Sequence, residues 1–277
     1  MSKYKYIFVD LDGTLCNKDS QVSRKDIETI KKAVDKGNKF VICSGRIPGH
    51  IKYILKDLGF YGNKNEYVIC SNSALFINDA LEVIKSKPLR KEYIDTVIDT
   101  IEEFDLPCHL YTFNYTIPYK CSSFPRFVRK DFVNFPNVDD YELLKDLVHA
   151  DNIYKISIVS KDFPYLDKLT DELYKKLEGK IIISPCSPTN YMEINDIGQD
   201  KGSGLVDFCK LFNINIDETL AIGDNNNDIS LLKVAGFSAC PSNGSDLAKQ
   251  NAGYICERDN NHDAVSEVIE RFVLNDD

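Results

Sequence analysis

The chain has 277 residues, of which 43% are hydrophobic and 28% charged, and its formal net charge is −9 at pH 7. This composition is typical of a soluble globular protein, and the length allows one large domain or two modest ones. The negative charge argues against nucleic acid or an anionic membrane as the main partner, whereas a small phosphorylated ligand needs only a local cationic pocket.

The first 80 residues alternate between strand and helix patterns. Apolar runs over residues 4–9, 39–43 and 67–70 each end at a small or polar residue, as buried parallel strands do. Between the first two runs, apolar residues recur at helical spacing, with Ser23 as the expected N-cap and Gly37 as the stop. This alternation predicts a parallel, doubly wound sheet.

The middle of the chain, residues 82–195, has a different pattern. Its predicted strands come partly in adjacent pairs, which indicates hairpins in an antiparallel sheet backed by helices near residues 94–104 and 165–177. These strands are expected over residues 109–113, 116–119, 154–159, 180–184 and 191–194. We interpret the segment as a second domain inserted into the first.

The last 80 residues return to the alternating pattern. Strands are expected over residues 220–222, 237–240 and 254–256, and helices around residues 205–212, 229–232 and 263–273. The predicted fold class is therefore α/β, with a doubly wound, Rossmann-like parallel-sheet core and an inserted α/β domain that contains an antiparallel sheet. Residues 1–81 and 196–277 are expected to form the core, and residues 82–195 the insertion.

The nine cysteines form no CxxC pair and no Cys/His cluster at zinc-like spacing, and several lie in apolar segments. Free thiols in such segments behave as small hydrophobes, which favours a reduced, cytoplasmic compartment. The N-terminal residues lack a signal-peptide apolar stretch, and no run approaches transmembrane length. We expect a cytoplasmic monomer or weak homo-oligomer that binds neither nucleic acid nor membrane.

Two aspartates lie two residues apart directly after the first predicted strand, in the segment Asp10-Leu11-Asp12-Gly13-Thr14. Ligands of open α/β sheets bind at the carboxyl ends of the strands. Two crowded carboxylates repel each other, so a metal ion or a shared proton is expected to compensate. Taken alone, the segment also fits an Asx-rich turn.

Three further polar segments follow expected strands or begin an expected helix: Ser44-Gly45-Arg46, Asp200-Lys201-Gly202 and residues 223–228. The carboxylates offer hard oxygens to Mg²⁺, while Ser44, Lys201 and N–H groups at helix starts offer donors to a phosphate. Each segment alone also fits a structural turn. Residues 223–228 do not form an EF-hand, because Ile229 stands where that loop requires glycine.

Taken together and in this order, the four segments resemble the motifs of the haloacid dehalogenase-like (HAD) phosphatase superfamily. The insertion between the second and third motifs is similar to the C2-type (C2B) α/β cap of its Cof-like branch. Residues 70–74, 241–244 and 251–255 also resemble that branch, although it usually has Asn-Gly-Ala where this chain has Asn72-Ser73-Ala74.

The resemblance implies a role for each motif residue. Asp10 would be the nucleophile that forms an aspartyl-phosphate, and Asp12 the general acid and base. The phosphoryl oxygens would be held by Ser44, Gly45, Lys201 and Asn227. Mg²⁺ would be held by Asp10, the backbone carbonyl of Asp12, Asp224 and Asp228, the last directly or through a water.

The implied function is a Mg²⁺-dependent phosphatase of small phosphorylated metabolites, with sugar phosphates as the expected substrates and the cap as the selector of the leaving group. The expected substrate contacts are Arg46, Asn72, Tyr115, Tyr119, Arg126 and Asn190. A phosphomutase with the same aspartyl-phosphate is the alternative among enzymes. A phosphoacceptor signalling domain or a binding domain on a phosphatase scaffold is the alternative outside enzymes.

Overall fold

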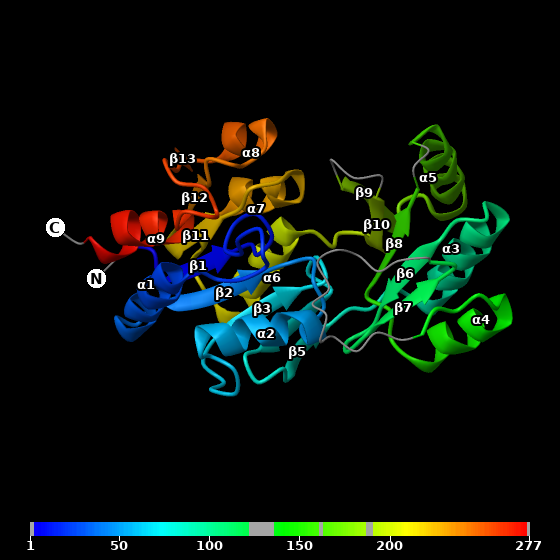
Figure 1. Ribbon diagram of the computed structural model, residues 1–277, viewed down its shortest axis with the longest axis horizontal. Coiled ribbons are helices and arrows are strands. Elements are labelled where there is room, and N and C mark those ends of the chain that lie inside the picture. Colours follow the sequence, from blue (N-terminus) through cyan, green and yellow to red (C-terminus); the bar gives the residue numbers. More distant parts are fainter. Residues whose placement is uncertain (1–2, 122–135, 161–162, 187–190, 276–277) are drawn as a thin grey trace. The chain divides into compact units, whose positions relative to one another are not determined.

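The computed structural model describes residues 3–121, 136–160, 163–186 and 191–275. The chain divides into two compact units, of which the first combines Met1–Arg46, Ile51–Ile84 and Asp200–Asp277. The second unit combines Ile47–His50 and Lys85–Gln199. Figure 1 follows the chain through both. The first unit therefore contains both ends of the chain.

An eight-stranded sheet forms the centre of the first unit, in the order β13-β12-β11-β1-β2-β3-β4-β5. The pairings from β13 to β3 are parallel, and β3 pairs with β4 antiparallel. Strand order reverses between β1 and β11, so this is the switch point at which doubly wound sheets bind ligands. The strands are β1 (Tyr6–Val9), β2 (Lys39–Cys43), β3 (Tyr67–Cys70), β4 (Leu75–Asn78), β5 (Val83–Ser86), β11 (Thr219–Ile222), β12 (Phe237–Cys240) and β13 (Tyr254–Ile255).

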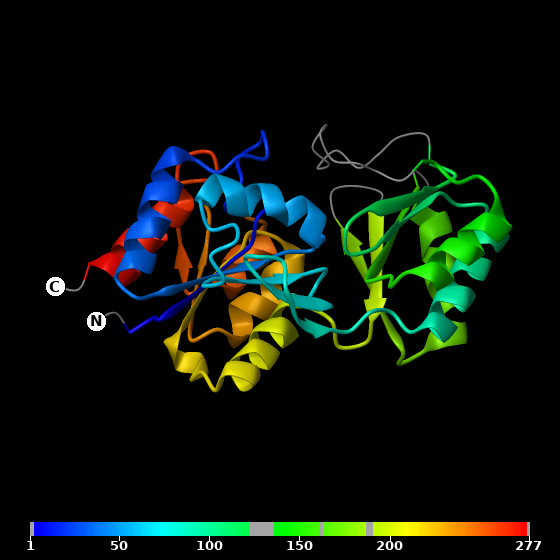
Figure 2. The ribbon, with the colours of Figure 1, turned by 90° about the horizontal axis from the view of Figure 1, so that it is seen from below.

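Helices cover both faces of this sheet, with α1 and α2 on one face and α6, drawn in yellow, on the other (Figure 2). Ser23 caps α1 by accepting a hydrogen bond from the Asp26 N–H, and Asp200 caps α6 in a capping box with Ser203. The helices are α1 (Arg24–Asp35), α2 (Pro48–Leu58), α6 (Lys201–Phe212), α7 (Ile229–Val234), α8 (Asp246–Asn251) and α9 (Ala264–Ile269). A 3₁₀ turn, η2 (Asn226–Asp228), precedes α7, and a π-helical turn, η3 (Glu270–Leu274), follows α9.

The second unit is built on a five-stranded antiparallel sheet in the order β7-β6-β8-β10-β9. Alternate residues such as Leu110, Ile156 and Ile194 pack in one apolar cluster with α3, α4 and α5, which lie on one side of the sheet (Figure 2). The strands are β6 (Cys108–Tyr111), β7 (Thr116–Tyr119), β8 (Lys155–Val159), β9 (Ile181–Cys186) and β10 (Tyr191–Asp196). The helices are α3 (Lys91–Glu103), α4 (Tyr141–Ala150) and α5 (Phe163–Leu177).

The predicted fold class is confirmed, because a largely parallel α/β sheet and a separate antiparallel sheet are both present. The sequence analysis predicted no helix or strand for the residues that form α2, β4, β5, α4 and α8. Part of the reason is visible at β4, where the chain turns back after β3 within four residues, too short a connection for the β–α alternation expected there. None of the described helices is long and apolar enough to cross a membrane.

Candidate functional site

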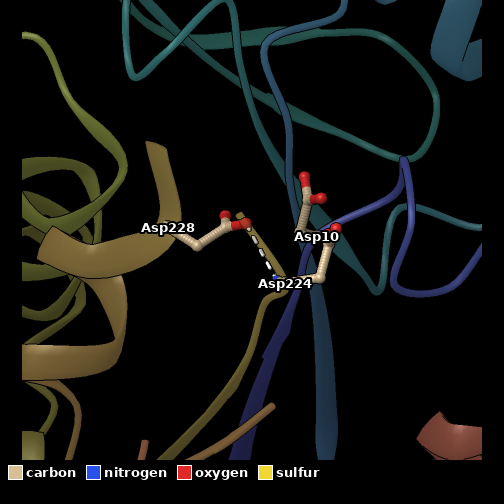
Figure 3. A group of neighbouring side chains, drawn as sticks. All are labelled: Asp10, Asp224 and Asp228. Carbon is tan, nitrogen blue, oxygen red and sulfur yellow. Dashed lines mark hydrogen bonds between the residues drawn. The ribbon is translucent and has the colours of Figure 1, made fainter. Parts of the chain in front are cut away.

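Three buried aspartates meet at the switch point between β1 and β11. Asp10 directly follows β1, and its N–H donates to the carbonyl of Ile222 at the end of β11 over 3.0 Å. Asp224 lies two residues beyond β11, and Asp228 closes η2. Figure 3 shows the three side chains beside one another, and one oxygen from each carboxylate lies within 4.8 Å of the others.

Lys201, at the start of α6, is the cation of this cluster. Its side chain is 2% exposed, and its Nζ lies 2.6 Å from both Asp10 Oδ1 and Asp228 Oδ1. Burial alone would lower the pKa of Lys201, but the two carboxylates outweigh it and raise the pKa. Lys201 is therefore a permanent positive charge between Asp10 and Asp228.

The carboxylates outnumber the lysine, and the pKa values of Asp10 and Asp224 are raised. Burial, followed by repulsion from Asp228, raises the pKa of Asp10 well above its ordinary value. The same two causes raise the pKa of Asp224 to about 7, although a 2.8 Å hydrogen bond from Thr14 Oγ1 opposes the shift. Buried carboxylates with raised pKa values and hard oxygen atoms fit a divalent cation such as Mg²⁺.

Asp228 also shapes the loop that carries Asp224. Its Oδ2 accepts from the N–H groups of Asp224, over 3.1 Å, and of Asn225, over 3.0 Å; Figure 3 marks the first of these bonds. A Cβ on Gly223 would come within 2.6 Å of the Asp228 Cβ, so only glycine fits there. The loop thus wraps closely around a carboxylate that is fully buried.

Asp12 differs from these aspartates because its side chain is 50% exposed. Arg46 holds both of its oxygens: Arg46 Nε donates to Asp12 Oδ2 over 2.8 Å, and Nη2 donates to Oδ1. Gly13 turns the backbone at φ +85°, where a Cβ would lie 2.4 Å from Asp224 Oδ2. Asp10 is therefore a buried carboxylate, whereas Asp12, two residues later, is half-exposed.

Ser44 follows β2 and is 2% exposed, and its Oγ accepts from the N–H of Arg46 over 3.1 Å. The next turn, after β3, supports this one: the N–H of Asn72 donates to the carbonyl of Ser44, and the N–H of Ser71 to that of Arg46. Gly45 lies within the Ser44–Arg46 turn, whereas Asn227 is exposed in η2. The guanidinium of Arg46 pairs with Asp12, and its expected contact with substrate stays a prediction.

The remaining expected substrate contacts fall in the second unit. Tyr115 donates its hydroxyl to Asp151 Oδ2 over 3.0 Å. Tyr119 is buried in the apolar cluster with its hydroxyl donating to Glu102, which is a packing environment rather than an open binding surface. Arg126 and Asn190 lie outside the described residues.

Sequence reasoning assigned no role to three residues that contact the site's loops. Thr14 donates to Asp224, and its place in the segment that begins at Asp10 was the available signal. Asn243 Nδ2 donates to the carbonyl of Gly13 over 2.8 Å, and Asn260 Nδ2 donates to that of Cys16 over the same distance. Both asparagines lie more than 200 residues from the turn they hold, so no local pattern indicates the contact.

Comparison with known proteins identifies the family of the chain. Residues 7–269 match the family model of haloacid dehalogenase-like hydrolases. The chain is 27% identical to 5-amino-6-(5-phospho-D-ribitylamino)uracil phosphatase YcsE of Bacillus subtilis, over 98% of this chain and 96% of the relative. It is 28% identical to a phosphoglycolate phosphatase of Methanobrevibacter smithii, over 97% and 98% of the two chains.

A crystal structure of a haloacid dehalogenase-like hydrolase from Bacteroides thetaiotaomicron superposes with a TM-score of 0.83 at 27% identity, covering 97% of this chain and 99% of that one. The family match and the phosphatase names of the relatives bear out the expectation of an enzyme of the phosphomonoester hydrolase class. The chain belongs to the haloacid dehalogenase-like hydrolase family.

Proposed function

We propose that the protein is a Mg²⁺-dependent phosphatase of small phosphorylated metabolites, sugar phosphates among them, and that it reacts through an aspartyl-phosphate on Asp10. The observation that carries the proposal is the buried group of Asp10, Asp224 and Asp228 around Lys201 at the sheet's switch point. Such a site joins a nucleophile, a cation site and a fixed positive charge, which phosphoryl transfer requires.

Asp10 is the proposed nucleophile. Lys201 holds Oδ1, so the other oxygen of Asp10 attacks phosphorus while the bond from phosphorus to the leaving oxygen breaks. Bound Mg²⁺, held by Asp10, the Asp12 carbonyl, Asp224 and Asp228, would supply positive charge against the phosphoryl oxygens. Ser44, Gly45, Lys201 and Asn227 are the proposed ligands of those oxygens.

Asp12 is the proposed proton carrier. It gives its proton to the departing alkoxide and then takes a proton from the water that attacks the aspartyl-phosphate, which releases inorganic phosphate and restores Asp10. Its half-exposed side chain supports this role because a proton carrier must reach both the leaving group and water.

The named relatives act on a phosphoribitylamino-uracil and on phosphoglycolate, so the same chemistry serves very different leaving groups in those proteins. We propose that residues 82–195 select the leaving group and that the protein works in the cytoplasm.

The test is phosphate release by the purified protein with Mg²⁺, using p-nitrophenyl phosphate and a panel of sugar phosphates. Asp10→Asn is expected to remove turnover, at least about 10³-fold, because the amide is a poor nucleophile. Asp19→Asn is the matched control, since Asp19 is an exposed aspartate of the same loop. Acid quenching followed by peptide mass analysis should find the phosphoryl group on Asp10.

Three outcomes would contradict the proposal. Turnover retained by a folded Asp10→Asn variant would exclude the aspartyl-phosphate. Transfer of the phosphoryl group to a second hydroxyl, in a reaction that needs an activating bisphosphate, would identify a phosphomutase. A single phosphorylation without turnover would indicate a phosphoacceptor domain.

A further inference from the structure

Three asparagines from two distant loops hold the turn that carries Asp12. Asn243, in the loop after β12, donates from Nδ2 to the carbonyl of Gly13 over 2.8 Å. Asn260, in the loop before α9, donates from Nδ2 to the carbonyl of Cys16 over 2.8 Å. Its neighbour Asn261 accepts at Oδ1 from the N–H of Lys18 over 3.0 Å. The turn is thus held from outside at the carbonyls of Gly13 and Cys16, and the chain just beyond it is held at Lys18.

The asparagines are also bonded to one another. The N–H of Asn260 donates to Asn243 Oδ1 over 2.9 Å, and Asn261 Nδ2 donates to Asn260 Oδ1 over 3.2 Å. Asn260 is 9% exposed, whereas Asn243 is exposed. Asn260 is therefore the buried centre of the group, and each of its polar side-chain atoms has a partner.

Two of the three hydrogen bonds within the turn are long, so the bonds from outside add to its support. The N–H of Thr14 donates to the carbonyl of Leu11, and the N–H of Leu15 to that of Asp10, each over 3.3 Å. The stronger internal bond runs from the N–H of Cys16 to the carbonyl of Leu11 over 2.7 Å. Asn260 donates to the carbonyl of Cys16, and the N–H of Cys16 donates to the carbonyl of Leu11, the residue before Asp12. Loss of the Asn260 side chain therefore acts on the backbone next to Asp12.

The loop of Asn243 also contacts the acidic loop. The N–H of Ser245 donates to the carbonyl of Asp224 over 2.8 Å, and Ser245 Oγ donates to Asn226 Oδ1 over 3.2 Å. One short loop therefore ties the turn of Asp12 to the loop of Asp224. A displacement of either loop would change the position of Asp12 relative to the buried carboxylates.

We propose that Asn260 and Asn243 are positioning residues for proton transfer by Asp12. The inference rests on the proposed function, because it assigns these side chains to the step in which Asp12 protonates the leaving oxygen. Neither side chain is bonded to Asp10 or Lys201, and a shift of the Asp12 carbonyl away from Mg²⁺ would slow the reaction of every substrate alike. The specific effect of their loss is therefore weaker proton transfer by Asp12.

The test compares two aryl esters of nearly equal size, p-nitrophenyl phosphate and phenyl phosphate, with Mg²⁺. Nitrophenolate leaves with little help from an acid, whereas phenolate needs a proton. The measured quantity is the ratio of kcat/KM for the two esters, which reports the steps up to loss of the leaving group. We expect Asn260→Ala to lower kcat/KM for phenyl phosphate about tenfold more than for p-nitrophenyl phosphate.

Two further variants extend the test. Asn243→Ala and Asn243→Asp should shift the ratio in the same direction but less, because Asn243 is exposed. Asn243→Ala removes both the donor to Gly13 and the acceptor for Asn260, whereas Asn243→Asp removes only the donor. Asn251→Ala is the matched control: it removes a similar 2.7 Å amide bond, to the carbonyl of Leu247, away from the turn. Its ratio should equal that of the wild type.

A folded Asn260→Ala variant with the wild-type ratio, even at lower activity, would overturn the inference and leave the proposed function intact. If Asn260→Ala does not fold, unchanged ratios in both Asn243 variants would overturn it instead. A wild-type protein that hydrolyses neither ester would contradict the proposed function and this inference with it.

Discussion

Lys201 in the first unit and Lys155 in the second are both buried in ion pairs, but their surroundings differ. Lys201 Nζ lies 2.6 Å from two carboxylates, and a third belongs to the same cluster. Lys155 Nζ lies 2.5 Å from Glu193 Oε1 and 4.6 Å from the centre of the Tyr111 ring. The first arrangement has an excess of negative charge, whereas the second contains a buried ion pair between Lys155 and Glu193.

The difference shows which property of a buried ion pair points to function. A balanced pair offsets its own desolvation and belongs to the packing of a sheet. An unbalanced cluster needs another cation or a proton, and burial together with repulsion from Asp228 raises the pKa of Asp224 to about 7. The excess of carboxylates, and not the burial of charge, therefore distinguishes the candidate active site.

The largest expected effect comes from replacing each lysine in turn. Lys201→Met should lower kcat for p-nitrophenyl phosphate by about 10²–10³-fold, because a fixed charge beside Asp10 is lost. Lys155→Met should leave kcat within about threefold and instead lower the free energy of unfolding by about 3 kcal/mol, because Glu193 stays buried without this partner. Steady-state kinetics and urea unfolding measure the two effects.

The double variant Lys155→Met/Glu193→Leu is the control for the second unit, because it removes both charges. It should recover most of the lost stability. An equal loss of turnover in the Lys155 and Lys201 variants would contradict the assignment of Lys201 to turnover and of Lys155 to stability.

The next effect concerns pH. Because the folded-state pKa of Asp224 lies above its ordinary value, the folded protein binds this proton more tightly than the unfolded chain does. Stability of the metal-free protein should therefore fall as pH rises from 5 to 8, by on the order of 2–4 kcal/mol. Thermal unfolding in a chelator measures the slope.

Mg²⁺ should reverse this trend, because it competes with the proton and stabilises the protein more at pH 8 than at pH 5. Asp224→Asn, which cannot ionise, should flatten the slope and weaken the effect of Mg²⁺. A metal-free wild type whose stability rises between pH 5 and 8 in parallel with the variant would contradict the assigned charge excess.

The smallest effect concerns backbone strain, which the two units also distribute differently. Ser71, Asn72 and Ser73 follow β3 with φ of 51°, 55° and 76°, whereas Asp105 and Lys120 in the second unit are single residues with positive φ. Ser73→Gly should raise the free energy of unfolding by about 1 kcal/mol, because glycine adopts this conformation without a Cβ penalty. Ser73→Ala is the control, since it removes the hydroxyl and keeps the Cβ; equal stabilisation by both variants would contradict the strain.

Much of the fold was predictable because its signals are local. The apolar run of β2 and the caps Ser23 and Asp200 indicate where elements begin and end, and the structure has β2 over the predicted residues. Helix α4 was missed although Asp140 caps it by accepting from the N–H of Leu143. A short helix with few buried apolar residues gives a weak periodic signal.

Some features of the candidate site could also be predicted from the sequence, and others could not. Asp10, Lys201 and Asp224 could be proposed from the sequence because strand ends and helix starts converge at the switch point of any doubly wound sheet. The pairing of Arg46 with Asp12 and the burial of Tyr119 could not, because they depend on which rotamers the surrounding packing allows.

The amino-acid order alone was therefore sufficient for the α/β class, the family resemblance and the residues at each strand end, since all of these follow from short-range patterns. Three-dimensional packing was needed to bring Lys201 between Asp10 and Asp228 and Asn260 onto the turn of Asp12. The physical reason is separation along the chain: contacts between residues about 190 to 240 positions apart form only when the sheet has set its strand order and register.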